Sequence, residues 1–544
     1  MQMVVMRTCG PASSRIWRDS RLTVLVLHWA ARAILAEGFG VPSATLVEPR
    51  SRLVSDLVPA AAVRGTSCNT QLRFPDSSRS YTVYSQTQID PLVSFRNSQR
   101  EQVRGTIINL QRKSLVMEVY NPYSIVQVSE VLSELTVRMG SKNAYMGKAV
   151  VVSLVNTGLT AVVSVALIDE WRELSVLPNE AKSVGREAEL FISDWDARFN
   201  IRRDYQIVVN EMRAFLSEVS RWVEQVDLTE SLPKTDGRLR EDLFYELATP
   251  IMHKIKSYLV RLEEQAERVD VEIAPVHRTY AQAALHPLLL RAPFVYRTFS
   301  KPLGYAGDYE MVNQIVSDPQ QGPTTYFQIV NTAFLKAAVA TAHRNRITLL
   351  IDFLTRQAEA ARVAGRPFRI LNVGCGPAFE IQRFVREYAQ PDLLSFQLVD
   401  FSEETLAFTK AAIERAAGEA GHKVSVETVH QSVHDLLKRK VFPDPVLREF
   451  DAVYCAGLFD YLSDKVCVRL LRYFAASTRP GGQLLVTNVH SANPEKYGME
   501  HLLEWYLIYR NESGMLLLLP PQSAEQKLYV DETGVNVFAE ATIP

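Results

Sequence analysis

The chain has 544 residues, 47% of them hydrophobic and 22% charged, a composition typical of a soluble globular protein with roughly two to four domains. Its 60 Lys and Arg residues nearly balance its 61 Asp and Glu residues, which argues against a nucleic acid or a membrane surface as partner. The five cysteines lack metal-ligand spacing and suit a reducing cytoplasm, so we expect a cytoplasmic protein without a metal site.

Residues 1–70 are predicted to form a poorly ordered extension. Four arginines between residues 7 and 21 precede the apolar run 22–27, in a pattern similar to a secretory signal. His28, Arg32 and Glu37 interrupt that run, which is also too short to span a bilayer. We therefore favour an amphipathic or poorly ordered extension over a signal sequence, and we expect no transmembrane segment.

Residues 71–175 have the texture of a small β-barrel, because short β-rich runs alternate with polar or glycine turns. The runs are 106–109, 115–119, 135–138, 148–154 and 160–167. This layout resembles PilZ-type domains, some of which bind a cyclic dinucleotide through an R-x-x-x-R segment and a D/N-x-S-x-x-G turn. Arg96 to Arg100 matches the first motif, but Gln111 and Ser114 depart from the second. The resemblance therefore implies a degenerate barrel for docking or regulation more than a cyclic-dinucleotide site.

Residues 184–300 are predicted to form a helical cap subdomain. Tyr205, Val208, Met212 and Phe215 begin an apolar stripe that recurs every three or four residues, which is typical of helices packed on a core. We expect this subdomain to pack on the next domain and to cap its cleft.

The segment 301–313, K-P-L-G-Y-A-G-D-Y-E-M-V-N, opens the last predicted domain, residues 301–544. Two glycines and a proline favour a loop, and Asp308 is a plausible N-cap for the helix that follows. Tyr305 and Tyr309 would then either pack or act from a lid over a bound ligand, donating hydrogen bonds to it.

A glycine turn at residues 374–378 follows the apolar run 370–373 and precedes a helical pattern, and a second apolar run ends at Asp400. This context favours a nucleoside site, with the acidic residue on the ribose. A dinucleotide is disfavoured because Phe379 replaces the third glycine and Pro377 lacks a backbone N–H for a pyrophosphate. S-adenosylmethionine, a nucleoside without phosphate, fits better, although a glycine turn that serves packing alone remains the alternative.

Further strand and helix patterns complete an α/β, doubly wound, Rossmann-like sheet. The expected strands are 424–429, 451–455 and 483–487, with a late edge strand at 535–538 and a turn at 479–482. The loops at the carboxyl ends of the strands should converge on one ligand.

The pattern V-G-C-G-P-A followed by L-V-D-F-S resembles class I S-adenosylmethionine-dependent methyltransferases. Together with the segment 301–313, A-G-L-F-D-Y-L, E-W-Y-L-I-Y-R and T-G-V-N-V-F, it is similar over roughly residues 200–544 to the family of extracellular-factor 3-hydroxypalmitic acid methyl ester biosynthesis proteins. The resemblance implies an O-methyltransferase that acts on a fatty-acid carboxylate and gives a methyl ester, a candidate quorum signal.

Site roles follow from these patterns. For the cofactor we predict Gly374 and Gly376 at the methionine part, Asp400 at the ribose, Phe401 on the adenine face, Ser432, Val433 and Asp435 at the adenine edge, and Asp308 in the lid. For the acceptor we predict Tyr305, Tyr309 and His490 as catalytic candidates, with Arg510 and Trp505 as substrate-binding residues on an apolar helix 502–510.

The chemistry of methyl transfer does not by itself identify the acceptor. A carboxylate is already ionised at neutral pH, so its methylation needs no general base. Methylation of another small molecule or of a protein side chain, and a non-catalytic S-adenosylmethionine-binding module, remain as alternative functions.

Overall fold

The computed structural model describes residues 92–111, 113–121, 125–139, 142–156, 160–169, a few positions between 185 and 196, and then 200–229, 232–271, 273–389, 393–438 and 449–544. The chain divides into two compact units, Met1–Val83 and Tyr84–Pro544, and every described residue belongs to the second. The extension predicted over residues 1–70, and the part of the predicted barrel before residue 92, lie outside the described residues.

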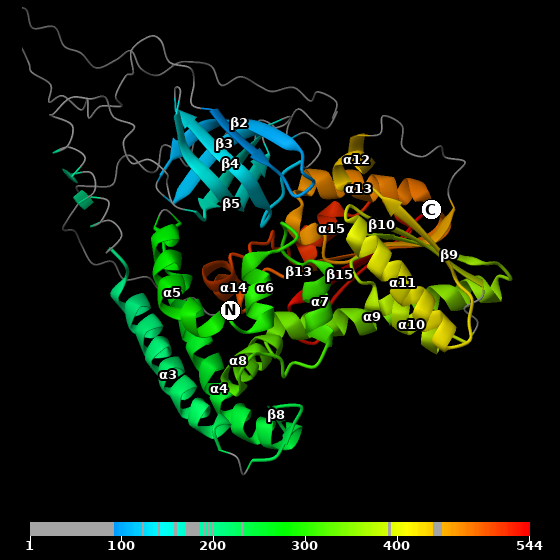
Figure 1. Cartoon of the computed structure of the whole chain (residues 1–544). Helices are drawn as coiled ribbons and strands as arrows, with labels where there is room; N and C mark the ends of the chain where they lie inside the picture. Colours follow the sequence, from blue (N-terminus) through cyan, green and yellow to red (C-terminus); the bar gives the residue numbers. More distant parts are fainter. Residues whose placement is uncertain are drawn as a thin grey trace, which may run out of the picture. The chain divides into compact units, whose positions relative to one another are not determined.

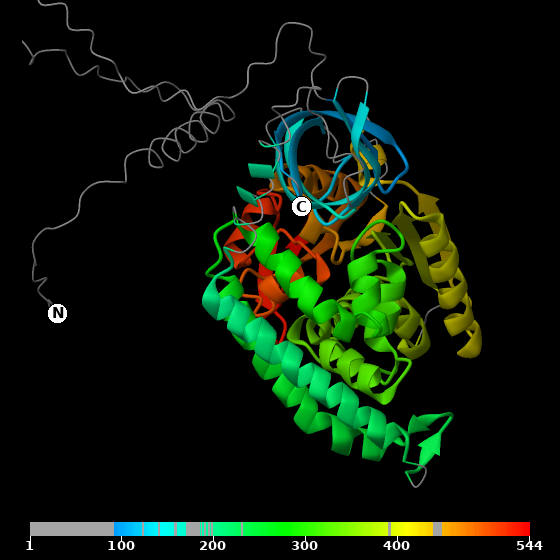
Figure 2. The same ribbon diagram turned by 60° about the vertical axis from the view of Figure 1, so that its left-hand side comes forward.

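A closed barrel of six strands begins the described chain, as Figure 2 shows. Its strands are β1 (Leu92–Arg96), β2 (Gln102–Leu110), β3 (Ser114–Tyr120), β4 (Val131–Met139), β5 (Lys142–Asn156) and β6 (Thr160–Leu167), paired antiparallel in the order β1-β2-β3-β6-β5-β4. In β6 every second side chain is buried, because successive side chains of a strand point to opposite faces. The barrel prediction is confirmed, and β1 is a strand that the sequence patterns missed.

Long helices follow the barrel and share one hydrophobic core. They are α3 (Arg203–Asp227), α4 (Glu241–Ala266), α5 (Ala274–Leu289), α6 (Pro293–Ser300), α7 (Tyr309–Val316) and α8 (Thr325–Leu335), with a small hairpin of β7 (Lys234–Thr235) and β8 (Arg238–Leu239). The apolar stripe of α3 is buried at Tyr205, Val208 and Met212, as its helical spacing predicts. Among the described helices, none combines the length and the apolar content needed to cross a bilayer.

A seven-stranded sheet forms the C-terminal part of the chain (Figure 1). Its strands are β9 (Phe368–Val373), β10 (Leu394–Asp400), β11 (Ser425–His430), β12 (Phe450–Cys455), β13 (Thr478–Val489), β14 (Glu525–Val530) and β15 (Asn536–Thr542), in the order β11-β10-β9-β12-β13-β15-β14. The first five run parallel, whereas β15 is antiparallel to both of its neighbours. The doubly wound, Rossmann-like sheet is thereby confirmed.

Helices cover both faces of this sheet. One face buries a cluster shared with α9 (Ala338–Val363), α10 (Phe379–Glu387) and α11 (Glu403–Glu419), and the other packs on α12 (Val433–Lys438), α13 (Asp464–Ser477) and α15 (Glu512–Leu518). Because parallel strands are joined by crossover helices, their carboxyl ends meet at one edge of the sheet. The order of β10, β9 and β12 changes direction at β9, which places the switch point beside the glycine turn.

Three sequence predictions are wrong in detail. The predicted helix 502–510 does not form, because α14 (Lys496–Leu503) ends at Glu504, whose φ is +50°. The strand predicted at the edge is β15, which lies inside the sheet because β14 covers its outer side. Residues 479–482, predicted as a turn, fall within β13 as an irregularity, where the register with β12 shifts between Thr478 and Gln483 and Gly481 has a φ of +74°.

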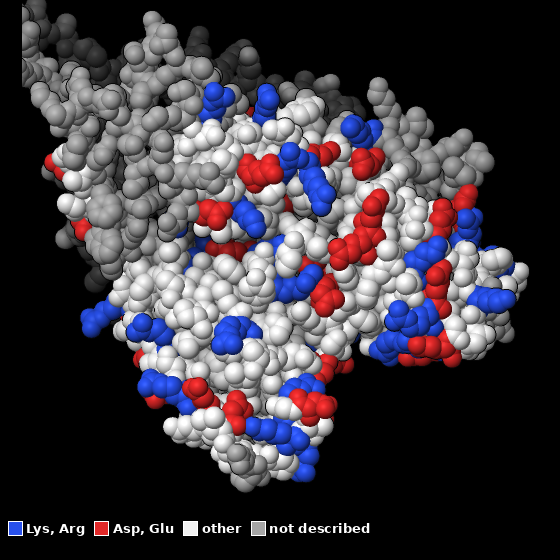
Figure 3. Space-filling view, in the orientation of Figure 1, with Lys and Arg blue, Asp and Glu red and all other residues white. Residues whose placement is uncertain are grey.

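Charged side chains are mixed over the face seen in Figure 3, where Lys and Arg alternate with Asp and Glu without a large field of one sign. On that face the described surface therefore lacks the basic stripe typical of nucleic-acid binding.

Glu130, just before β4, joins two segments of the barrel. Its Oε1 accepts hydrogen bonds from the backbone N and the Oγ of Ser98, at 2.6 and 2.7 Å, and its Oε2 accepts one from the backbone N of Gln127 at 2.8 Å. Burial nevertheless raises the pKa of Glu130 from 4.5 to about 7, because a low-dielectric environment disfavours the charged form.

This shift predicts a pH dependence of stability. Between pH 4.5 and 7 the folded chain holds a proton on Glu130 that the unfolded chain has released, so the contribution of Glu130 is complete below pH 4.5 and is lost as the pH rises through 7. Relative to Glu130→Gln, the wild type should lose about 1 to 3 kcal/mol of unfolding free energy across this window. Urea unfolding at both pH values measures the difference, and Glu118→Gln, on an exposed position of β3, is the control. Parallel pH curves for wild type and Glu130→Gln would contradict the assignment.

Candidate active site

The glycine turn lies between β9 and α10, at the carboxyl edge of the sheet. Gly374, Gly376 and Ala378 all have positive φ, at +68°, +51° and +48°, a region that glycine adopts without steric cost. A Cβ at Gly374 would lie 3.2 Å from the Leu458 side chain, whereas a Cβ at Gly376 would meet nothing within 4 Å. The turn therefore packs tightly at its first glycine and faces open space at its second, as a cradle for a ligand requires.

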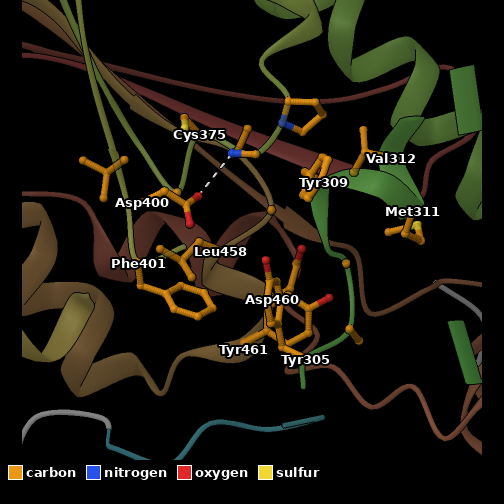
Figure 4. Close-up of a pocket in the computed structure, with 18 of the residues that line it drawn as sticks. Tyr305, Tyr309, Met311, Val312, Cys375, Asp400, Phe401, Leu458, Asp460 and Tyr461 are labelled. Carbon is orange, nitrogen blue, oxygen red and sulfur yellow. Dashed lines mark hydrogen bonds between the residues drawn. The ribbon is translucent and has the colours of Figure 1, made fainter. Parts of the chain in front are cut away.

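Asp400 ends β10 beside this turn. Its buried carboxylate accepts hydrogen bonds from the backbone N of Gly376 at 3.3 Å and from that of Ser402 at 3.0 Å, and Figure 4 shows it facing the turn. Burial raises the pKa of Asp400 above its usual value. An acceptor held in this position fits the hydroxyl groups of a ribose.

Two aromatic side chains, Phe401 and Tyr305, extend the site beyond Asp400. Phe401 contacts Tyr305 of the lid edge to face, with ring centroids 4.9 Å apart, and both residues line the cavity together with Asp400, Gly374 and Gly376. The glycine turn, the ribose residue and one lid tyrosine are thus brought together as predicted in the sequence, and the geometry fits S-adenosylmethionine.

The other two lid residues have further partners. Asp308 caps α7 by accepting from the backbone N of Met311 at 2.8 Å and pairs with Arg297 at 2.8 Å, and it is not among the residues that line the cavity. Tyr309 does line the cavity, but its hydroxyl donates to Glu404 at 2.6 Å, which raises its pKa to about 12. The structure therefore gives Asp308 a capping role in place of cofactor contact.

The loop after β11 contributes through different residues from those predicted. Val433 lines the cavity, as do Gln431 and Leu436. Ser432 and Asp435 instead bind each other, because the Ser432 hydroxyl donates to the carboxylate at 2.7 Å and accepts from the Asp435 backbone N at 3.1 Å. These two side chains stabilise the first turn of α12 and do not line the cavity.

His490 and Arg510 are not brought to the cavity. His490 lies 3.0 Å from the exposed Glu512. The buried guanidinium of Arg510 donates to Asn488 Oδ1 at 2.6 Å, to the carbonyl of Phe459 at 2.8 Å and to that of Leu462 at 2.6 Å, and it pairs with Asp464. Because its donors are engaged inside the domain, the structure replaces the predicted substrate contact of Arg510 with a structural role.

Trp505 does reach the cavity, as predicted, and its Nε1 donates to the hydroxyl of Tyr461 at 3.0 Å. Asp460 and Tyr461, from the motif A-G-L-F-D-Y-L, also line it, as does Tyr305 (Figure 4). Asp460 Oδ1 accepts from the backbone N of Val489 at 2.6 Å, and burial raises the pKa of Asp460 to about 6.

Sequence reasoning missed Arg346, which lies on α9 and lines the cavity. This residue is buried, and its Nη1 has no hydrogen-bond partner among the described residues. A Cβ at Gly457 would lie 2.9 Å from that atom, so the guanidinium abuts the loop after β12. The sequence signal that could have identified Arg346 is an arginine at a core-facing position of a helix, between the buried His343 and Leu350.

Arg346 is a suitable anchor for a carboxylate. Among the described residues that line the cavity it is the single lysine or arginine, and a buried guanidinium with an unpaired Nη1 favours an anion that supplies a hydrogen-bond acceptor. The methionine carboxylate of S-adenosylmethionine is such an anion. His343 beside it stays neutral, because burial and the nearby arginine lower its pKa to about 3.

Known proteins support the same assignment of fold and cofactor. Residues 370–482 match the family described as "Methyltransferase domain", and no curated protein sequence matches the chain. The chain is an S-adenosylmethionine-dependent methyltransferase, and S-adenosylmethionine is its cofactor.

Solved structures show weaker likenesses. A possible exported protein from Bordetella parapertussis is 16% identical, with a TM-score of 0.37 over 55% of this chain and 97% of its own. Magnesium protoporphyrin IX methyltransferase from Synechocystis PCC 6803, with bound S-adenosylhomocysteine, is 11% identical, with a TM-score of 0.30 over 49% of this chain and 99% of its own. An N-methyltransferase from Bradyrhizobium japonicum WM9 is 12% identical, with a TM-score of 0.28 over 43% and 98%. Similarities at this level carry no information about the acceptor.

The anchor assignment predicts the effect of Arg346→Met. This variant should bind S-adenosylmethionine about 10- to 100-fold more weakly, because a charge-assisted hydrogen bond is lost, and isothermal titration calorimetry measures the change. Arg344→Met is the matched control, since Arg344 lies on the same helix, donates to Ile315 and Thr341, and does not line the cavity. Equal affinities for wild type and Arg346→Met would refute the anchor.

The structural role of Arg510 predicts that Arg510→Met destabilises the fold by about 2 to 4 kcal/mol, because buried carbonyl and amide oxygens lose their donor. Denaturant unfolding checks this value. Arg383→Met, which removes an exposed pair with Glu387 on α10, should change stability by about 0.5 kcal/mol or less. A fully stable Arg510→Met variant that has lost affinity for the acceptor would restore the role predicted from the sequence.

Proposed function

We propose that this methyltransferase transfers a methyl group to the carboxylate oxygen of an acid with an apolar body, of the 3-hydroxy fatty acid type, and releases a methyl ester. The observation that carries the proposal is the apolar cavity wall away from the glycine turn. That wall is formed by Met311, Val312, Trp505 and Leu507. It suits a hydrocarbon chain, and the lid motif's resemblance to the 3-hydroxypalmitic acid methyl ester family supports the same acceptor.

Bound S-adenosylmethionine supplies an electrophilic methyl group on a sulfonium. The residues around it have distinct tasks: Gly376 leaves space for close backbone approach, Asp400 accepts from the ribose, and Arg346 holds the methionine carboxylate. Tyr305 of the lid and Trp505 border the space for the acceptor and exclude water from it. Because an anion and a sulfonium react to give uncharged groups, a water-poor site favours this transfer.

The titratable groups of the cavity also favour an acceptor that is already ionised. His343 has a pKa lowered to about 3 by burial, and its Nδ1 donates to the carbonyl of Val339 at 2.8 Å, so it is a weak base. Glu380 accepts from the hydroxyl of Tyr454 at 2.7 Å and is thereby engaged. A fatty carboxylate with an ordinary pKa of about 4 to 5 needs neither group to lose a proton at neutral pH.

One observation favours a second candidate, methylation of a hydroxyl or amine group on another small molecule. Asp460 lines the cavity with its pKa raised to about 6 by burial, which brings it nearer to the range of a general base. This second reaction would require Asp460 to accept a proton from the acceptor.

Product analysis distinguishes the two. Purified protein and S-adenosylmethionine are incubated with 3-hydroxydecanoate, decanoate, decanol and decylamine, and mass spectrometry detects the methylated products. We expect methyl esters from the acids alone, with a rate that changes by less than about twofold between pH 6.5 and 8 because the carboxylate is ionised throughout. A methyl ether or methylamine, or a rate that follows ionisation of Asp460 and disappears in Asp460→Asn, would contradict the carboxylate proposal.

A further inference from the structure

Part of the cavity wall comes from the β-barrel, which the methyl-transfer chemistry does not require. The residues of the barrel that line the same cavity as Asp400 and Trp505 come from two segments. They are Ser98 and Gln99, in the turn between β1 and β2, and Gln127, Val128 and Glu130, just before β4. We refer to these five residues as the barrel wall. They include two positions of the R-x-x-x-R segment, residues 96–100.

The barrel wall is rigid. The carboxylate of Glu130 holds Ser98 and Gln127 together through three hydrogen bonds of 2.6 to 2.8 Å. Asn97 adds a bond from its Nδ2 to the carbonyl of Ile125 at 2.9 Å and accepts from the backbone N of Glu101 at 2.8 Å. Because both segments are cross-linked by buried polar groups, their side chains keep a fixed shape toward the cavity.

The barrel wall is also fixed to the methyltransferase domain. The backbone N of Val131 donates to the carbonyl of Gly304, in the lid loop, at 2.7 Å. Ser129 donates through its Oγ to the carbonyl of Glu504 at 3.3 Å and accepts from the backbone N of Tyr506 at 3.0 Å. Val128, Val131 and Val150 pack with Tyr506 in one buried cluster. These contacts join the barrel to the lid and to the segment that carries Trp505.

The position of Val128 indicates which half of the cavity the barrel closes. Its neighbour Tyr506 is flanked by Trp505 and Leu507, both of which line the cavity, whereas the cofactor residues Gly376 and Asp400 belong to β9 and β10 and their loops. Gln127, next to Val128 in the chain, lines the cavity as well. Within the R-x-x-x-R segment, Ser98 serves this wall through its hydrogen bonds to Glu130, whereas Arg96 pairs with the exposed Glu134 at 2.8 Å outside the wall.

We infer that the barrel closes the acceptor half of the cavity and that Val128 and Gln127 determine which acceptors are accepted, by contacting the apolar body of the acceptor. The inference rests on the proposed function only for the chemical class of the acceptor. The barrel is then a part of the catalytic cavity that sets specificity.

Binding of a two-part probe tests this inference without turnover. The probe is an S-adenosylhomocysteine analogue in which a nitrogen replaces the sulfur and carries a decyl chain in place of the transferable methyl. Calorimetry compares its affinity with that of S-adenosylhomocysteine for wild type and for Val128→Trp, which narrows the barrel wall. We expect the decyl analogue to bind Val128→Trp at least about tenfold more weakly, while the affinity for S-adenosylhomocysteine changes less than about twofold.

Controls make the outcome decisive. Val162→Trp, a half-buried position of β6 outside the cavity lining, should leave both affinities unchanged. Thermal unfolding verifies that each variant folds. If Val128→Trp does not fold, Gln127→Trp, at a partly exposed position, takes its place, and the same change in the two affinities is expected. If Val128→Trp weakens both ligands equally, the barrel lies at the cofactor half of the cavity. If the decyl analogue binds Val128→Trp as tightly as wild type, the barrel is not part of the acceptor site. Either result overturns the inference. If the proposed function fails, wild type makes no methyl ester from either acid, yet the decyl analogue still distinguishes Val128→Trp from Val162→Trp.

Discussion

The partly buried Glu504 is the point on which the geometry of the cavity depends. Its left-handed backbone ends α14, and its carboxylate accepts from Gln282 Nε2 at 2.8 Å and from the hydroxyl of Tyr506, with the guanidinium of Arg278 4.0 Å away. Lys301 donates to the neighbouring carbonyl of Leu503 at 3.0 Å. Through this residue the helices, the lid loop and the barrel hold one segment, and that segment presents Trp505 and Leu507 to the cavity and Tyr506 to the barrel. Buried charges of this kind contribute mainly through their partners, since any one of them left alone would be costly.

Local patterns were sufficient for the cofactor end of the site. Strands with continuous apolar runs, a glycine turn and an acidic residue at the end of the next strand identify a parallel sheet with a nucleoside crevice, because each signal lies within one strand-turn-helix unit. Gly374, Gly376, Asp400 and Phe401 accordingly lie together. The capping role of Asp308 is likewise a local feature, since the helix that it caps begins at the next residue.

The acceptor end could not be predicted in this way, because long-range contacts form it. Arg346, on α9, abuts the loop after β12. The barrel wall adjoins Tyr506, which lies far from it along the sequence. The apolar spacing of residues 502–510 suggested a helix, but Glu504 turns the backbone and the polar network around it overrides local propensity. Arg510 was predicted to be a substrate ligand from its type alone, whereas four described residues engage its guanidinium.

The contact between Ser129 and Tyr506 joins positions 377 residues apart. During synthesis the barrel therefore leaves the ribosome long before the segment that completes the cavity. Until that segment is made, the apolar side of the barrel wall stays uncovered. Contacts of such high sequence separation form late and slowly. A ribosome-bound chain can assemble the nucleoside crevice earlier than the acceptor cavity, so this arrangement withholds catalytic competence until the segment that carries Trp505 and Leu507 has been synthesised.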